Sequence, residues 1–108
     1  MLKYKVVISS QAKSSLRNIY NYIKETGSLQ AAEKVRDGLI DAISGLAVNP
    51  ESNGPANDLN DEVIVYRRIL IWSYRIVYRI QEDKLEVLVV EVHHTKQDSS
   101  KIKEKLGL

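Results

Sequence analysis

Two hydrophobic periodicities follow one another along the 108-residue chain, and their order is the strongest constraint on its fold. Over residues 12–46, apolar side chains recur every three or four positions, which is typical of amphipathic helices. Over residues 63–93 the chain is instead rich in β-branched and aromatic residues, which indicates strands. Helices grouped before strands predict an α+β fold rather than a parallel α/β fold.

The helical region divides into two helices, which we expect to pack as an antiparallel hairpin because only about two residues join them. Ser9 or Ser10 provides an N-cap for the first helix, which ends at Gly27, and Ser28 provides one for the second. Gly38 lies inside the second helix, where glycine costs about 1 kcal/mol relative to alanine. It indicates either a close approach of the first helix or a tolerated flaw. The predicted buried stripes are Ala12, Leu16, Ile19, Tyr20 and Ile23, then Ala32, Val35, Leu39, Ile43 and Leu46.

The strand region predicts an antiparallel meander. Its apolar runs are separated by short links, and such links permit only antiparallel pairing. We expect the helical hairpin to cover one face of this sheet and to leave the other face free. A short strand precedes the helices, and a weak polar helix ends the chain. The predicted segments are strands at 3–9, 63–71, 74–80 and 85–93 and a helix at 97–106, in one domain that spans residues 1–108.

A loop over residues 49–62 joins the helices to the strands. It holds both prolines of the chain, Pro50 and Pro55, and a single large apolar residue, Leu59. Loops of this length are uncommon in compact domains and are often functional or mobile. The alternative is a solvated connector. The loop is acidic, with a net charge of −4 from Glu51, Asp58, Asp61 and Glu62.

The formal net charge of +2, from 16 basic and 14 acidic residues, hides an uneven distribution. Residues 63–81 carry four arginines and no acidic residue, and arginine suits bidentate contacts with phosphate or carboxylate. The chain has no cysteine, which excludes a disulfide framework, a thiolate zinc site and a cysteine nucleophile. The apolar run at the N-terminus is too short for a signal peptide, and no run approaches the ~20 residues of a membrane span. We therefore expect a cytoplasmic protein without a membrane partner.

The arginines of the strand region are candidates for a cationic surface. Arg75 and Arg79 project to one face of their strand, away from the tyrosines and isoleucines that fit under the helices. Arg67 and Arg68 project to opposite faces of the preceding strand, so periodicity does not decide which of them joins Arg75. Such a surface would bind an anionic partner. The alternative is a solvent face on which the arginines pair with nearby acids.

The two histidines, His93 and His94, end the last predicted strand. Adjacent strand residues face opposite ways, so at most one histidine can lie beside Arg75. Glu91 shares a face with His93, which makes Glu91, His93 and an arginine a candidate acid–base group. The alternative is a half-buried histidine with a packing role. Two adjacent histidines cannot bind a metal ion from one face, so we expect no metal site. The sequence has no glycine-rich phosphate loop, and we expect no cofactor.

Several segments, taken in their order, form a recognisable pattern. They are the helical pattern of residues 12–46, the pair Asn49-Pro50 with a glycine-containing loop, the pair Tyr66-Arg67, the run Tyr74-Arg75-Ile76-Val77-Tyr78-Arg79-Ile80, and a valine-rich strand that ends at His94. Together they resemble the ParE/RelE superfamily of bacterial type II toxins, over about residues 3–98. The resemblance implies a small toxin of the plasmid-stabilisation type, which a cognate antitoxin wraps and neutralises in a heteromeric complex.

The resemblance implies two alternative activities. ParE-like toxins inhibit DNA gyrase, whereas RelE-like toxins cleave messenger RNA on the ribosome by attack of a 2′-OH on the adjacent phosphate. In a RelE-like reading, Arg75 takes the place of a strand arginine and Arg67 that of one basic residue on the preceding strand. Glu91 would supply the base, and His93 or His94 the acid.

The nuclease set is incomplete in this chain. Its second basic position falls near Ile69, its last arginine falls near Thr95 with Lys96 as a stand-in, and no tyrosine follows Tyr78. We therefore predict a ParE-like toxin that inhibits gyrase and is not an enzyme, with the messenger-RNA endoribonuclease as the alternative. A domain that only binds its antitoxin is a third hypothesis. The residues predicted to contact the target or the antitoxin are Arg67, Arg68, Arg75, Arg79 and Lys96.

Overall fold

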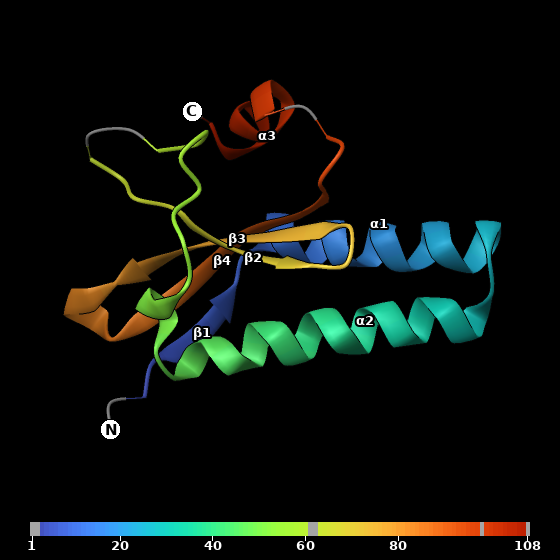
Figure 1. The fold of residues 1–108 in the computed structure, drawn as a ribbon, viewed down its shortest axis with the longest axis horizontal. Helices are drawn as coiled ribbons and strands as arrows, with labels where there is room; N and C mark the ends of the chain where they lie inside the picture. The colour runs from blue at the N-terminus through green and yellow to red at the C-terminus, as the bar shows by residue number, and fades with distance from the viewer. Residues whose placement is uncertain (1–2, 61–62, 98, 108) are drawn as a thin grey trace.

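The computed structural model describes residues 3–60, 63–97 and 99–107. Its helices and strands follow the predicted order and form an α+β fold (Figure 1). No helix in these ranges combines the length and the apolar character that crossing a bilayer requires. The elements are β1 (Lys5–Ile8), α1 (Ser10–Thr26), α2 (Leu29–Ser44), β2 (Arg67–Ile71), β3 (Tyr74–Gln81), β4 (Glu86–His94) and α3 (Ser99–Leu106), with 3₁₀ turns at 45–47, 50–52 and 82–84.

The four strands form one sheet in the order β1-β4-β3-β2. Strands β2, β3 and β4 pair antiparallel through tight turns, which confirms the predicted meander. Strand β1 pairs in parallel with β4, and its end is fixed where the Ser9 N–H donates to the Val89 carbonyl at 2.9 Å. Helix α1 therefore begins directly beside the last part of β4.

Serine side chains set the beginnings of both long helices. Ser9, rather than Ser10, caps α1, because its hydroxyl accepts from the Ala12 N–H at 3.0 Å. Ser28 caps α2 by accepting from the Ala31 N–H, also at 3.0 Å. These bonds satisfy backbone donors that have no partner within the helix. The short link between the helices makes them an antiparallel pair, as predicted (Figure 1).

The main core lies between this helical pair and the sheet. Leu39 and Ile43 of α2 and Ala12 of α1 are buried in one cluster with Ile76 and Tyr78 of β3. The tyrosine–isoleucine face of β3 is therefore the inner one, as its alternation predicts. Burial of this apolar surface is the main force that holds the two layers together.

Gly38 makes room for an aromatic ring. A Cβ at this position would lie 2.3 Å from the indole of Trp72. Trp72 belongs to the two-residue turn between β2 and β3 and has a left-handed backbone conformation, with φ of 51°. The glycine does mark a close approach, but the neighbour that requires it is the hairpin turn and not the first helix.

The prediction that the second face of the sheet is free is wrong. Helix α3 lies on the side of the sheet opposite to α2 (Figure 1). The long loop and α3 cover this face because Val77 and Val90 project apolar side chains toward it. The second core comprises Ala56, Leu59, Tyr66, Val77, Val90 and Ile102.

Strand β2 is shorter than predicted, since it begins at Arg67 and not at residue 63. The preceding loop pairs with the start of this edge strand: the Ala56 N–H donates to the Tyr66 carbonyl at 2.8 Å, and the Arg68 N–H donates to Gly54 at 3.0 Å. The loop is thus a packed cover for the sheet rather than a solvated connector. Two of the four acidic residues of the loop, Asp61 and Glu62, lie outside the described residues.

Strand β4 carries one extra residue. Its pairing with β3 skips Val90, which lies between Val89 and Glu91. Such a bulge changes which face the following side chains reach. The shift brings His93 directly opposite Arg75 of β3.

Candidate functional site

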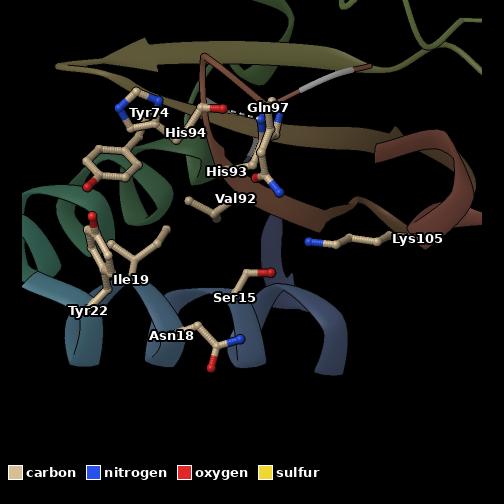
Figure 2. Close-up of a pocket in the computed structure, with 10 residues that line it drawn as sticks. All are labelled: Ser15, Asn18, Ile19, Tyr22, Tyr74, Val92, His93, His94, Gln97 and Lys105. Carbon is tan, nitrogen blue, oxygen red and sulfur yellow. Dashed lines mark hydrogen bonds between the residues drawn. The ribbon is translucent and has the colours of Figure 1, made fainter. Parts of the chain in front are cut away.

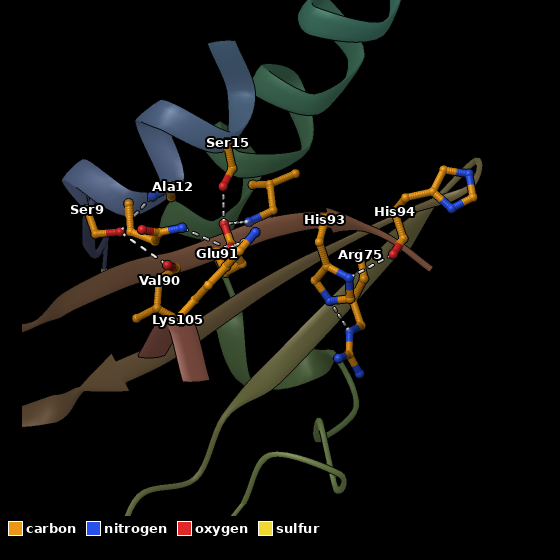
Figure 3. A network of polar contacts seen from close by, with 11 residues as sticks. Ser9, Ala12, Ser15, Arg75, Val90, Glu91, His93, His94 and Lys105 are labelled. Atoms are coloured by element: carbon orange, nitrogen blue, oxygen red, sulfur yellow. Dashed lines mark hydrogen bonds and ion pairs between the residues drawn. The ribbon is translucent and has the colours of Figure 1, made fainter. Parts of the chain in front are cut away.

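Arg75 is the centre of a polar cluster on the face of the sheet away from α1 and α2. Its Nε donates to Nε2 of His93 at 2.8 Å (Figure 3). Its two terminal nitrogens donate to the two carboxylate oxygens of Asp58 at 2.8 and 3.0 Å. The Arg75 side chain is only 12% exposed and that of Asp58 is 35% exposed. Strands β3 and β4 thus fix the arginine and the histidine, and the loop supplies the carboxylate.

His93 is held as a neutral hydrogen-bond acceptor. Its Nδ1 lies 2.8 Å from the carbonyl oxygen of His94, which can only accept, so we assign the proton to Nδ1. Nε2 then accepts from Arg75. Burial lowers the pKa of His93 from 6.5; its hydrogen bond to the His94 carbonyl opposes this shift, and the charge of Arg75 adds to it. At neutral pH the ring therefore orients Arg75 and carries no proton on Nε2.

A second arginine faces the same cavity. The strand register places Arg68 on the Arg75 face of the sheet. Together with Asp58 and His93, the two arginines line a cavity of about 330 Å³. The question that periodicity left open is thereby answered: Arg68, and not Arg67, joins Arg75.

The other basic candidates lie outside this cavity. The guanidinium of Arg67 donates to the carbonyls of Glu51 and Asn53, at 3.2 and 2.8 Å, and so attaches the loop to the sheet. Arg79 is half-buried farther along β3, opposite Leu88 near the start of β4. Lys96 is exposed in the turn that follows β4. The structure therefore does not bring the five predicted contact residues into one surface.

Glu91 is fully buried between α1 and α3. The Ser15 hydroxyl and the Gln11 amide of α1 donate to its carboxylate, the latter at 3.2 Å. The Val92 N–H donates at 2.9 Å, and the ammonium of Lys105 lies 3.8 Å away on α3. These donors compensate a carboxylate inside the protein, where an unpaired charge would be very costly. They hold Glu91 apart from the cavity of Arg75 (Figure 3).

His94 lies in a different environment from His93. Its ring makes an edge contact with Tyr74, with ring centroids 5.5 Å apart and planes at 77°. It borders a larger cavity, of about 560 Å³, between α1 and the ends of β3 and β4. Tyr22 and Tyr74 lie at one end of this cavity and Lys105 at the other (Figure 2). Only His93 contacts Arg75, as the alternation along the strand predicts.

Three residues of these clusters carried no functional signal in the sequence. Asp58 was one of four acids in the loop, and only the folded chain places it on Arg75. Ser15 and Lys105 lie on polar stretches of their helices, where nothing marks a buried partner. Within the residues that the structure describes, no three side chains of His, Asp or Glu come together to hold a metal ion.

Comparison with known protein families gives one match. A family model described as the ParE toxin of the type II toxin-antitoxin system parDE matches residues 6–99, which is most of the chain. No curated protein matches.

Solved structures share the fold. The chromosomal ParDE toxin-antitoxin system of P. aeruginosa aligns with a TM-score of 0.70 at 15% identity, over 85% of this chain and 96% of that one. The toxin-antitoxin complex RelBE2 of Mycobacterium tuberculosis aligns at 0.64 and 20% identity, over 87% and 93%. The isolated RelE toxin of E. coli aligns at 0.57 and 20% identity, over 94% and 97%. At these identities the similarity shows a common architecture and leaves the activity to be argued from the site.

Proposed function

Because the chain belongs to the ParE toxin family of type II toxin-antitoxin systems, we propose that it inhibits DNA gyrase and is neutralised by a cognate antitoxin. The resemblance to the ParE/RelE superfamily that the sequence indicated is thereby confirmed. Gyrase lies in the bacterial cytoplasm, where we propose that the protein acts.

The arrangement around Arg75 carries the proposal. Cleavage of RNA by its own 2′-OH requires a base, an acid and cations placed around one phosphate. His93 is occupied as an acceptor for Arg75, and Glu91 is buried against α1 and α3. Arg67 is bound to loop carbonyls outside the cavity. A toxin that acts by binding needs none of these groups to be available, and this favours gyrase inhibition over RNA cleavage.

A supercoiling assay tests the proposal. Purified protein, added to gyrase and relaxed plasmid with ATP, is expected to inhibit supercoiling or to trap a cleaved DNA complex. A topoisomerase of another class, assayed on the same plasmid, provides the control for non-specific binding to DNA. Unchanged gyrase activity at a large molar excess of the protein would rule the proposal out.

The antitoxin partner rests on the family and on the solved relatives. The ParDE and RelBE2 structures are both described as toxin-antitoxin systems or complexes. We therefore propose that this chain forms a heteromeric complex with the product of a gene beside its own. When the two proteins are co-expressed with a tag on one of them, purification through the tag is expected to yield both. Co-expression is also expected to restore the growth of cells that the toxin alone inhibits.

Messenger-RNA cleavage is the second candidate, and one observation favours it. Arg68, Arg75 and His93 line a single cavity, so two cations and an imidazole could surround a phosphate there. Programmed ribosomes incubated with the protein distinguish the two functions, because a nuclease would cut the message in the A site. Intact message together with inhibited gyrase would exclude this candidate, and a protein inactive in both assays would be a domain that only binds its antitoxin.

A further inference from the structure

The cavity between Arg68 and Arg75 already binds one carboxylate, and the geometry of that contact is well defined. Arg75 donates from both terminal nitrogens to Asp58, at 2.8 and 3.0 Å, and its Nε–H donates to His93 on the other side of the guanidinium. This is the bidentate fork that gives arginine its selectivity for carboxylates. Because His93 fixes the plane of the guanidinium, the fork is preorganised for a planar anion.

The charges in this cavity do not balance. Its lining contains two guanidinium groups and one carboxylate, and His93 is neutral there because burial lowers its pKa. Among the described residues, the side chain of Arg68 has no ion-pair partner. Its guanidinium lies near Gly54: a Cβ built on Gly54 would be 3.8 Å from Nη2 of Arg68. The cavity therefore has room and one positive charge left for a second anion.

The surroundings indicate the kind of molecule that carries this anion. Leu70 lines the same cavity and is 53% exposed, so an apolar side chain borders the charged site. A protein segment with an acidic and an apolar side chain would satisfy both Arg68 and Leu70. A nucleic-acid strand would instead leave Leu70 against a sugar–phosphate backbone.

We propose that the Arg68–Arg75 cavity is a docking site for an acidic side chain of a partner protein. The inference rests on the proposed function only in identifying that partner as the antitoxin. Asp58 occupies Arg75, and the incoming carboxylate binds beside it on Arg68 or exchanges with it on Arg75. Leu70 then packs against the segment that carries the acid.

A titration followed by NMR tests this site without gyrase and without the antitoxin. The probe is a capped hexapeptide that contains two glutamates and two leucines, and its glutamine counterpart is the control. The arginine Nε–H signals of Arg68 and Arg75 are expected to shift with the glutamate peptide only. Arg68→Gln is expected to weaken binding about fivefold, the size of one exposed ion pair. Arg79→Gln, which removes an arginine outside the cavity, is expected to leave the affinity unchanged.

Removing the internal carboxylate should have the opposite effect. Asp58→Asn is expected to tighten peptide binding severalfold, because Arg75 then lacks its own anion. A weaker affinity in this variant would overturn the proposal, since it would mean that Asp58 builds the site rather than competes for it. If Asp58→Asn fails to fold, the Arg68→Gln and Arg79→Gln pair still decides the question.

The same titration with two other anions, inorganic phosphate and a short single-stranded RNA, tests whether the site selects carboxylates. Equal shifts with inorganic phosphate would mean a general anion site, and tighter binding of a short single-stranded RNA would mean a nucleic-acid site; either result overturns the proposal. The outcome is independent of the gyrase assay. A protein that inhibits gyrase but ignores the peptide contradicts this inference alone, and one that binds the peptide without affecting gyrase contradicts only the proposed function.

Discussion

Arg75 donates its Nε–H to Nε2 of His93 over 2.8 Å, so the imidazole beside the arginine acts as an acceptor. The bond joins two neighbouring strands on the face that the long loop covers. It makes the histidine a positioning residue for the guanidinium and leaves Arg75 with two nitrogens directed at an anion.

Removing the acceptor should destabilise the protein. His93→Phe keeps a ring but leaves the buried Nε–H of Arg75 without a partner, which costs about 1–3 kcal/mol. His93→Gln can offer a side-chain carbonyl and should lose less. Urea unfolding of both variants measures the difference. A smaller loss in His93→Phe than in His93→Gln would mean that the ring volume, and not the hydrogen bond, is what the site needs.

Stability should fall in mild acid because of the same histidine. Burial lowers the pKa of His93 below its ordinary value of 6.5, so the unfolded chain binds a proton more readily than the folded one. The contribution of neutral His93 to the free energy of unfolding is therefore complete above pH 6.5, and it is lost progressively as the pH falls below that value. Urea midpoints measured between about pH 7.5 and pH 5 should decrease. His93→Gln should reduce the dependence of the urea midpoint on pH, and His94→Gln should not. If His93→Gln keeps the wild-type dependence, then His93 is not its cause.

Gly38→Ala should destabilise α2 although alanine favours helices by about 1 kcal/mol over glycine. The new Cβ would lie 2.3 Å from the Trp72 indole, which must move toward solvent. We expect a net loss of about 1 kcal/mol and a red shift of tryptophan fluorescence. Gly45→Ala is the matched control, because a Cβ there meets no atom within 4 Å. If Trp72→Ala does not relieve the defect, the indole is not its cause.

The buried carboxylate of Glu91 should depend on Ser15. Ser15→Ala removes a donor to a buried charge, and such hydrogen bonds contribute about 1.5–3 kcal/mol. Thermal and urea unfolding should both report a loss of this size. Ser14→Ala, at the exposed neighbouring position of α1, should change stability by less than about 0.5 kcal/mol. Combining Ser15→Ala with Glu91→Gln should cost less than the sum of the two single changes, because Ser15→Ala then leaves a neutral amide, and not a buried carboxylate, without the hydroxyl donor.

The parts of the fold that depend on local pattern were predictable from the sequence. Ser28 caps its helix, Gly27 ends the one before it, and Tyr78 lies on the inner face of β3, because capping, helix termination and alternation each involve only a few neighbouring residues. The tight turns likewise determined that the last three strands pair antiparallel.

The second core could not be predicted in this way. Leu59 is an isolated apolar residue in a polar stretch, and Ile102 shares its predicted helix with only one other apolar anchor, Leu106, so the pattern does not say which surface either residue covers. Both are nevertheless fully or almost fully buried on Val77, at 2% and 0% exposure. Their burial depends on contacts between segments that lie far apart in the chain. The pairing of Asp58 with Arg75 escaped prediction for the same reason.

The extra residue at Val90 divides β4 into two parts whose side chains face different surroundings. Val89, before the bulge, belongs to the main core, whereas His93, after it, belongs to the cavity. A regular pairing that continued from Val89 would place the carboxylate of Glu91 against Ile76 of the main core. Loss of one residue at this point would therefore move His93 out of its place opposite Arg75. The number of residues in this strand, and not only their identity, therefore decides which side chains line the cavity.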